Sequence, residues 1–380
     1  MKELEVPLVI QEHTKIKHAL LKQYISPWMN ILFSTQKKYK HPQVLIYIDG
    51  FSGPGVYYTD EKRDKECNGS PLIVAETANK YIEQNESRKI LIYCIDINKV
   101  CTDTLKEKIK EFNKYDQKWE VYNANFESKI FDILSDIQDS KLSGFPMFIF
   151  IDPYGYSSYP IKVLKEILFH PRTELFINFM IYDIIRFCKE KQFESILTEQ
   201  FGDEEYKKID ITSNPDDKQI YLKNLYCQNL KKYANAGYVM PFRVNTPDQG
   251  ERPRYYLIHV SKHIRALKVM KDSMFKMSQK DYSFEAIGIN TAQMSLFDDP
   301  EKISLEENLK EYCRSVFPKS LEYTHIEDWA YVNTNGVAKT IKKALLKLEA
   351  DNLIEISRKP RQQSNTVTKG AIIRSVKDEE

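Results

Sequence analysis

Several familiar ligand-binding patterns are missing from this chain of 380 residues. It has no G-x-x-x-x-G-K-[ST] sequence, which excludes the P-loop nucleotidases, and no G-x-G-x-x-G, which disfavours a nicotinamide or flavin dinucleotide. Its six cysteines lie far apart, without a Cys-x-x-Cys or a Cys/His cluster. That spacing argues against a structural zinc site, an iron–sulfur cluster or a disulfide framework. We therefore expect no metal centre, and reduced thiols in a cytoplasmic protein.

Signals for secretion and for membrane insertion are missing as well. The first residues, MKELE, match neither a signal peptide nor a transit peptide, and no apolar run approaches the ~20 residues of a membrane span. The formal net charge is only +2, so a nucleic-acid surface would have to come from local patches. A hydrophobic fraction of 42% and a charged fraction of 29% are those of a soluble globular protein, which at this length should hold two or three domains.

Two short, β-rich apolar runs each end in an acidic residue. The run at 45–48 leads into DGFSGPG at 49–55, and the run at 148–151 leads into DPYG at 152–155. A buried strand that stops at a carboxylate and then turns through glycines lets backbone N–H groups approach a ligand closely. Together the two runs predict a nucleoside-cofactor site and a planar-amine site at one edge of a sheet.

Strand-like and helical stretches alternate from about residue 44 to residue 200, which predicts a parallel sheet covered on both faces. The strand-like segments 238–244 and 255–260 are separated by a link too short for a crossover helix, so they should form an antiparallel hairpin. A parallel sheet of about seven strands closed by such a hairpin is typical of class I S-adenosylmethionine-dependent methyltransferases. The expected fold class is therefore α/β, Rossmann-like. We also expect a helix capped by Ser70, one long helix over 181–200 and a helical insertion at about 203–236.

A smaller second domain is predicted after a linker. The sheet domain takes residues 1–280, the linker 281–303 and the small domain 304–380. Three helical segments followed by two strand-like segments with a basic loop between them suggest a winged helix. Ten Lys or Arg residues against three acids lie between Lys339 and Lys377. The residues that we expect to bind nucleic acid are Lys339, Lys342, Lys343, Arg358, Lys359 and Arg361.

The cofactor expected at the first site is S-adenosylmethionine. Asp96 ends the second strand, where an acid would accept hydrogen bonds from both ribose hydroxyls. Asn125 and Phe126 follow the third strand and could face the adenine edge. The alternative is that these are ordinary strand-end turn residues. The expected cofactor-binding set is Asp49, Phe51, Gly53, Gly55, Ser70, Asp96, Asn125 and Phe126.

Asp152, Pro153 and Tyr154 offer what a conjugated amine needs. Such an amine is a poor nucleophile because its lone pair is delocalised, and hydrogen bonds to the Asp152 carboxylate and the Pro153 carbonyl would favour the attacking form. Tyr154 would supply a ring face for stacking. In a duplex the base would have to be flipped out. The alternative is a plain turn after a strand. His13, Lys17 and His18 on the N-terminal helix could cover the cofactor, but we assign them to a solvated helix face.

Five short sequences together resemble the three-Cys-motif partner protein family: HTxxKH at 13–18, IDGFSGPG at 48–55, GSPL at 69–72, IDPYG at 151–155 and INF at 177–179. The resemblance covers about residues 10–280. It implies a class I methyltransferase-like core and an association with a radical-S-adenosylmethionine-like protein that carries three cysteines. DPYG is also similar to the Asp-Pro-aromatic-Gly motif of tRNA guanine-N2 dimethyltransferases.

One segment of the linker points to a further partner. QMSLF at Gln293–Phe297 is similar to the peptide with which bacterial proteins dock on the replication sliding clamp, and plain linker anchoring is the alternative. For the whole chain we expect a methyltransferase that acts on an exocyclic amine of a nucleic-acid base, in DNA or RNA. The alternatives are a catalytically silent nucleotide- or nucleic-acid-binding partner subunit, and methylation of a small molecule or protein.

Overall fold

A computed structural model describes residues 6–36, 43–115, 117–153, 159–211, 214–244, 255–278, 284–286, 304–316, 318–360 and 363–376 of the chain. Everything said below about the structure refers to these residues.

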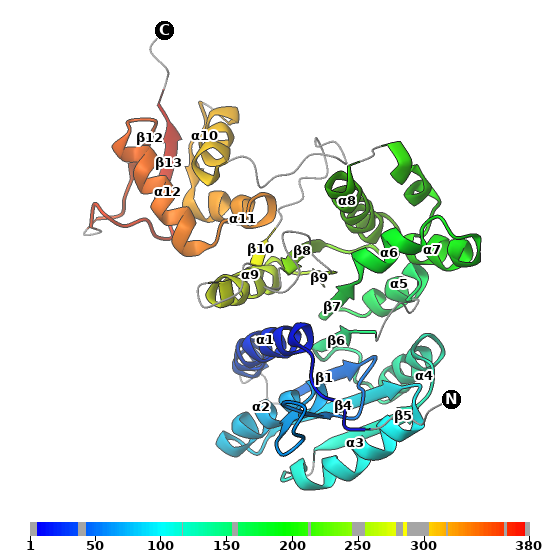
Figure 1. The fold of residues 1–380 in the computed structure, drawn as a ribbon. Helices are drawn as coiled ribbons and strands as arrows, with labels where there is room; N and C mark the ends of the chain where they lie inside the picture. Colours follow the sequence, from blue (N-terminus) through cyan, green and yellow to red (C-terminus); the bar gives the residue numbers. More distant parts are fainter. Residues whose placement is uncertain are drawn as a thin grey trace.

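The larger part of the protein is built on one mixed sheet of eight strands (Figure 1). The five strands β7, β6, β1, β4 and β5 are parallel, and β9 pairs antiparallel with β7. β8 and β9 form the predicted antiparallel hairpin, which is confirmed. The strands in sheet order are β10 (Phe284–Ala286), β8 (Tyr238–Val244), β9 (Tyr255–Ser261), β7 (Thr173–Phe179), β6 (Met147–Ile151), β1 (Gln43–Asp49), β4 (Arg88–Asp96) and β5 (Lys118–Asn123).

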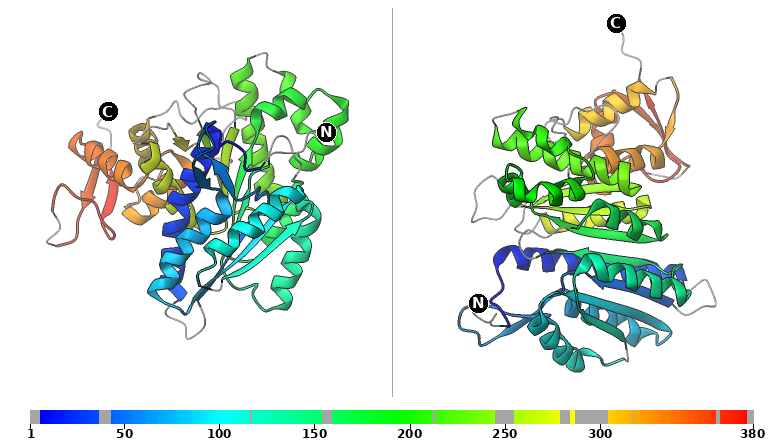
Figure 2. Two further views of the ribbon diagram at one scale, coloured as in Figure 1. Left: turned by 60° about the horizontal axis from the view of Figure 1, so that its bottom comes forward. Right: turned by 90° about the vertical axis from the view of Figure 1, so that its right-hand side faces the viewer.

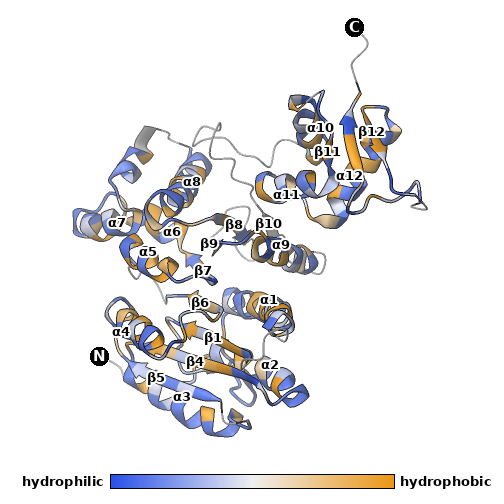
Figure 3. Ribbon diagram, turned by 180° about the vertical axis from the view of Figure 1, so that it is seen from behind, coloured by the Kyte–Doolittle hydropathy of each residue, from blue (hydrophilic) through white to orange (hydrophobic). Residues whose placement is uncertain are grey.

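Helices cover both faces of this sheet (Figure 2). Every residue of β1 is buried, as expected for a central parallel strand, and its side chains alternate between two apolar cores. Coloured by hydropathy, β1 and β4 are mostly apolar (Figure 3). One core is covered by α1 (Glu12–Gln36), α2 (Ser70–Gln84), α3 (Lys99–Phe112) and α9 (Ile264–Ser278). The other is covered by α4 (Phe126–Asp139), α5 (Ile161–Phe169), α6 (Ile181–Phe187), α7 (Glu194–Phe201) and α8 (Pro215–Ala234).

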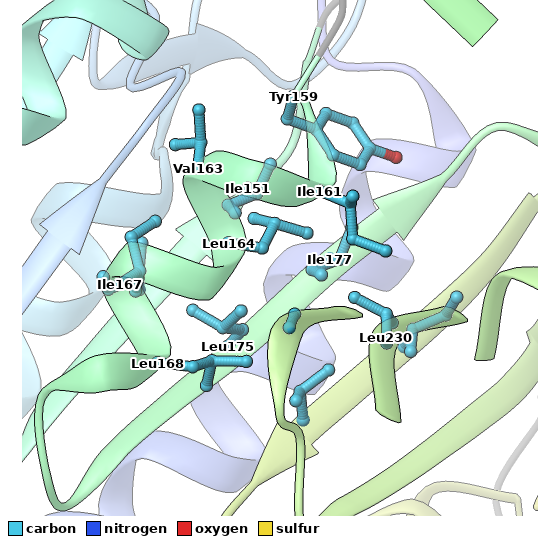
Figure 4. Close-up of a cluster of buried hydrophobic side chains, with 14 of the residues drawn as sticks. Ile151, Tyr159, Ile161, Val163, Leu164, Ile167, Leu168, Leu175, Ile177 and Leu230 are labelled. Carbon is cyan, nitrogen blue, oxygen red and sulfur yellow. The ribbon is translucent and has the colours of Figure 1, made fainter. Parts of the chain in front are cut away.

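The described residues of the segment 203–236, which the sequence suggested as an insertion, contribute side chains to the second core. Figure 4 shows Leu230 of α8 in the same cluster as Leu164 of α5 and Leu175 and Ile177 of β7. The ring of Tyr226, also on α8, stacks on Phe179 at the end of β7, with 4.4 Å between the ring centroids. The segment therefore covers the sheet as a structural helix.

The single long helix predicted over 181–200 is wrong. α6 ends at Phe187, a 3-10 turn follows at Lys191–Phe193, and α7 then begins at Glu194. The residues between the helices are polar and largely exposed, so no apolar stripe continues through them. The rings of Phe187 and Phe193 pack across the break at 4.3 Å.

Two smaller expectations also differ from the structure. Gly69 is the N-cap of α2, Ser70 is the first helical residue, and the Ser70 hydroxyl bonds to the Asp49 carboxylate. Within the expected linker, Phe284–Ala286 forms β10, which pairs with β8. Two further short strands, β2 (Val56–Tyr58) and β3 (Glu66–Asn68), form a separate antiparallel pair between the glycine turn and α2.

The C-terminal residues, coloured orange to red in Figure 1, form a unit with its own apolar core. This unit lies beside α9. Lys271 of α9 links the sheet domain to the C-terminal unit. Its ammonium group is buried and donates to the carbonyls of Tyr331 (2.9 Å) and Thr334 (2.6 Å). The elements are α10 (Leu305–Ser315), β11 (Leu321–Glu322), α11 (Tyr323–Asn333), α12 (Ala338–Ala350), β12 (Ile354–Ser357) and β13 (Ile372–Ser375), with an antiparallel sheet in the order β11-β13-β12.

The glycine turn gives a test of this packing. Gly55 has a φ of +75°, and a Cβ there would lie 2.5 Å from Cδ1 of Leu105 on α3. Gly55→Ala should therefore lower the free energy of unfolding by about 1–3 kcal/mol, measured by urea denaturation. Gly144→Ala is the matched control, since a Cβ there meets nothing within 4 Å. Equal stability of the two variants would contradict the close approach of the turn to α3.

Candidate functional site

Three carboxylates stand at the carboxyl ends of adjacent parallel strands. Asp152 follows β6, Asp49 ends β1 and Asp96 ends β4. In the sheet register Asp49 lies beside Phe150 on one side and Cys94 on the other. Asp152 and Asp96 are therefore each two residues beyond their partner, at the edge where ligands of open α/β sheets bind.

Asp49 is completely buried at the base of this edge. Its carboxylate accepts hydrogen bonds from the Tyr47 hydroxyl (2.9 Å), the Phe51 backbone N–H (3.3 Å) and the Ser70 hydroxyl. Burial raises the pKa of Asp49 to about 7, and the charge of Asp152 acts in the same direction. In this structure Asp49 therefore fixes the glycine turn and the start of α2 from behind.

Asp96 holds the other side of the turn. Its two carboxylate oxygens accept from the Gly53 N–H (2.9 Å) and the Asn98 N–H (2.8 Å). Burial raises the pKa of Asp96, although these two N–H groups oppose the shift. Gly53, with a φ of +56°, is partly exposed, whereas Gly55 is buried against α3. Of the two glycines, only Gly53 therefore reaches the open side of the turn.

An exposed apolar side chain next to Asp96 was missed in the sequence. Ile97 is 75% exposed, which places an apolar surface directly beside a carboxylate that can still accept hydrogen bonds. A single exposed apolar residue is common on protein surfaces. Its position after an acidic strand end was the signal that could have identified it.

Asn125 and Phe126 lie at the third strand end but have structural partners. Asn125 is the exposed N-cap of α4 and accepts from the Glu127 N–H at 2.8 Å. Phe126 is buried, packs against the ring of Phe51 at 5.4 Å and covers Gly50, where a Cβ would come within 2.8 Å of its ring. Phe126 therefore supports the glycine turn at Gly50 and packs against Phe51 next to it.

Asp152 is held by two residues from distant parts of the chain. The Lys17 ammonium lies 2.5 Å from Asp152 Oδ1, and the Asn178 side-chain amide donates to the same oxygen at 2.7 Å. The side chains of Lys17 and Asp152 are only 7% and 11% exposed. The assignment of Lys17 to a solvated helix face is therefore wrong. α1 turns this face towards the sheet because its other buried residues pack on the same side.

His18 is also buried, contrary to the same expectation. Burial lowers its pKa to about 4, an effect that Asp152 opposes and Lys17 reinforces, so the imidazole is neutral at neutral pH. Its Nδ1 and Oδ1 of Asn178 are buried and lack a hydrogen-bond partner among the described residues. Buried polar atoms are normally paired. These two atoms beside the Lys17–Asp152 pair are therefore places where a bound molecule could bond.

The remaining predicted site residues add little to this geometry. Pro153 is buried directly after Asp152, and Tyr154 lies outside the described residues. No group of His, Cys, Asp or Glu within the described ranges could hold a metal ion. In the part of the chain that the structure describes, no helix is long and apolar enough to cross a membrane.

Only some of the basic residues that were expected to bind nucleic acid are exposed. Lys339, Lys343 and Lys359 are exposed, and Lys342 lies over the Tyr323 ring, with its Nζ 5.9 Å from the ring centroid. Arg358 differs from the expectation, because its guanidinium is bound to the Glu349 carboxylate and to the carbonyls of Thr366 and Ile356. Arg361 and the Gln293–Phe297 peptide lie outside the described residues.

The residues at the sheet edge fit an adenosyl group in their chemistry. Asp96 supplies a fixed acceptor for a pair of hydroxyls, Ile97 supplies an apolar face for a ring, and Gly53 leaves room for close approach. S-adenosylmethionine would thus lie between β1 and β4, with Asp152 on the neighbouring strand.

Comparison with known proteins gives structural likenesses only. No protein-family model matches the chain, and no curated protein matches it either. Protein LPL1258 from Legionella pneumophila is 11% identical, with 71% of this chain and 97% of that chain covered and a TM-score of 0.41. The human methyltransferase 10 domain containing protein is 11% identical, with 68% and 89% covered and a TM-score of 0.33. A spermidine synthase in complex with the transition state analogue AdoDATO is 10% identical, with 70% and 67% covered and a TM-score of 0.34.

All three TM-scores lie below 0.5, so these likenesses decide nothing about activity. The strand order of this chain is an observation that does not depend on these likenesses. Five parallel strands followed by an antiparallel pair is the class I methyltransferase-like, Rossmann-like sheet expected from the sequence.

The Lys17–Asp152 pair can be tested by a double-mutant cycle. Lys17→Met and Asp152→Asn should each cost about 3–5 kcal/mol of unfolding free energy, because each leaves one buried charge without its partner. The double variant should cost clearly less than the sum, with a coupling of at least about 1 kcal/mol. Lys110→Met, in the exposed pair Lys110–Glu107, should change stability by less than about 0.5 kcal/mol. Additive effects of the two substitutions would show that the two charges do not interact.

Proposed function

We propose that this protein is an S-adenosylmethionine-dependent methyltransferase that acts on an exocyclic amine of a nucleic-acid base. The observation that supports this best is the state of Asp152. Both of its contacts are made by Oδ1, to Lys17 and Asn178, and no described residue bonds to Oδ2. One carboxylate oxygen is fixed while the other remains as an acceptor at the ligand-binding edge of the sheet.

In this mechanism Asp152 and Pro153 orient the amine. Asp152 Oδ2 accepts one N–H, and the Pro153 carbonyl is the second acceptor. Lys17 and Asn178 hold Asp152 Oδ1 in a nearly dry site, and hydrogen bonds to a carboxylate are stronger than hydrogen bonds to a neutral acceptor. When bound, S-adenosylmethionine supplies an electrophilic methyl group on a positively charged sulfur. The proton that the amine releases after transfer passes through Asp152 Oδ2 to water.

Positioning accounts for most of the rate in this scheme. Alignment of two reacting groups can supply roughly 7–11 kcal/mol of the barrier. The buried Lys17–Asp152–Asn178 contacts suit that role, because the backbone carbonyl of Asn178 in turn accepts from the Tyr159 hydroxyl at 3.0 Å. Neutral His18 beside them adds no charge that would repel the sulfonium.

The C-terminal unit would hold the nucleic acid. Its order of helix, strand, two helices and two strands suits a winged helix, and exposed Lys339 and Lys343 lie on α12, the last of the helices. We propose that α12 enters a groove of the nucleic acid, as the second helix of a helix-turn-helix does. Docking of a three-cysteine partner protein, and of a sliding clamp at Gln293–Phe297, belongs to the same proposal.

A catalytically silent binding subunit is the second candidate function. The full burial of Asp49 and the near burial of Asp152 favour it, since both carboxylates already have protein partners. Measured methyl transfer separates the two functions.

The first test measures methyl transfer and cofactor binding in the same variants. Asp152→Ala should reduce transfer of labelled methyl to mixed DNA or RNA on the order of 10²-fold or more, yet bind S-adenosylmethionine within about threefold of wild type. Asp96→Ala should weaken cofactor binding by about tenfold or more, by calorimetry, because a charged acceptor is removed. Asp139→Ala, at an exposed position of α4, is the control. No heat with the wild type, or equal turnover of Asp152→Ala, would refute the enzyme and leave the silent subunit.

The second test addresses the nucleic-acid surface. Lys339→Ala and Lys343→Ala together should weaken binding and reduce the slope of log affinity against log salt by about one for each phosphate that the protein no longer neutralises. Lys114→Ala, exposed on the loop before β5, should leave both quantities unchanged. Arg358→Ala should instead destabilise the C-terminal unit, since its guanidinium bonds Glu349. An unchanged salt slope in the α12 variant would make this unit a protein-interaction module.

A further inference from the structure

A second pocket lies at the opposite edge of the sheet. It sits between α1, α9 and the starts of β6 and β7, with a volume of about 420 Å³. α1 and α9 run next to each other there (Figure 1). β7 passes from Glu174 at the pocket to Asn178 at the Asp152 site, a separation of four residues or roughly 13 Å along the strand. The pocket is therefore distinct from the proposed methyl-transfer site and shares none of its residues.

The inner wall of this pocket is apolar and includes two aromatic rings. Leu32 and Val269 line it as partly exposed side chains, together with Tyr24 and Trp28 of α1, which are only 1% and 3% exposed. Its volume lies within the range of roughly 300–1,000 Å³ that small-molecule sites occupy. The wall thus suits a flat apolar body.

A largely buried carboxylate locks both rings in place. Glu174 accepts hydrogen bonds from the Trp28 indole N–H (3.0 Å) and from the Tyr24 hydroxyl. It also contacts Nε2 of fully buried His259 at 3.0 Å. With its charge bound to these three groups, Glu174 stabilises the shape of the pocket, and a ligand would meet a preformed wall that costs little to order.

The polar groups that remain unpaired around the pocket favour an anion. Arg172, Lys262 and Arg265 line its exposed side, and none of them has a carboxylate partner among the described residues. The Thr173 hydroxyl, also in the wall, is buried and lacks a hydrogen-bond partner within the described ranges. Three exposed cations without an ion-pair partner among the described residues thus stand beside an apolar wall.

We propose that this pocket binds a small aromatic anion, with its ring against Leu32 and Val269, beside the buried rings of Tyr24 and Trp28, and its acidic group at Arg172, Lys262 and Arg265. The site is independent of the proposed methyl transfer. Guanidinium groups suit a carboxylate, sulfonate or phosphate in this position, because they donate to it bidentately.

Two dyes with one skeleton test the proposal on the full-length protein: anilinonaphthalene sulfonate, which is an anion, and the uncharged N-phenylnaphthylamine. The anionic dye should saturate a single site and quench Trp28, read in a Trp119→Phe/Trp329→Phe background that leaves Trp28 as the one tryptophan. Arg265→Glu should raise the dissociation constant of the anionic dye about tenfold and that of the neutral dye less than about twofold. Lys114→Glu is the matched charge-reversal control and should change neither.

Variants that fill the pocket with larger side chains provide the second test. Val269→Phe should weaken both dyes by about tenfold or more without adding a second tryptophan, and Ala266→Leu, a smaller change in the same wall, keeps the test available if the first variant unfolds. Circular dichroism melting identifies such unfolding. The proposal is overturned if the filled variants bind both dyes as the wild type does. It is also overturned if Arg265→Glu weakens the two dyes equally, or if the anionic dye binds without quenching Trp28.

Discussion

The buried ion pair between Lys17 and Asp152 is the contact on which the arrangement of the site depends. Removing a carboxylate from water costs free energy unless a cation is placed beside it. Lys17 provides that cation from α1, and Asn178 adds a hydrogen bond from the next strand. The ion pair fixes the position of the Asp152 carboxylate, and it also fixes α1 on the sheet at the end where the strands stop.

A second set of polar contacts fixes the same helix at the opposite edge of the sheet. Tyr24 and Trp28 reach Glu174 near the start of β7, so α1 crosses the sheet with polar attachments at both edges. Between them the helix buries Leu20 and Leu21 in the apolar core. Apolar packing is not directional, whereas these hydrogen bonds are, and they determine which residues of α1 face each edge.

The sheet, its hairpin and most helix positions were predictable because their signals are local. Apolar runs that end in acids and a short link between two strand-like segments need no knowledge of distant residues. The partners of Asp152 and Arg358 were not predictable in this way. Lys17 lies 135 residues before Asp152 in the sequence, and a lysine among polar neighbours on a helix is ordinarily expected to be solvated. Arg358 stands in a basic loop, and only the fold brings Glu349 to its guanidinium. The burial of Asp49 likewise depends on α2, whose Ser70 the sequence assigned to a helix cap.

The attachment of the C-terminal unit has a consequence for dissecting the protein. Lys271 is on a helix of the sheet domain, but the two carbonyls that satisfy its ammonium group come from α11 and the residue that follows it. Phe275 of the same helix packs into the core of the C-terminal unit. A gene cut in the linker would therefore leave Lys271 without the two carbonyls that it bonds, and Phe275 without the core that covers it, on the fragment that keeps the sheet. The two units have separate apolar cores, but hydrogen bonds and apolar contacts of α9 join them.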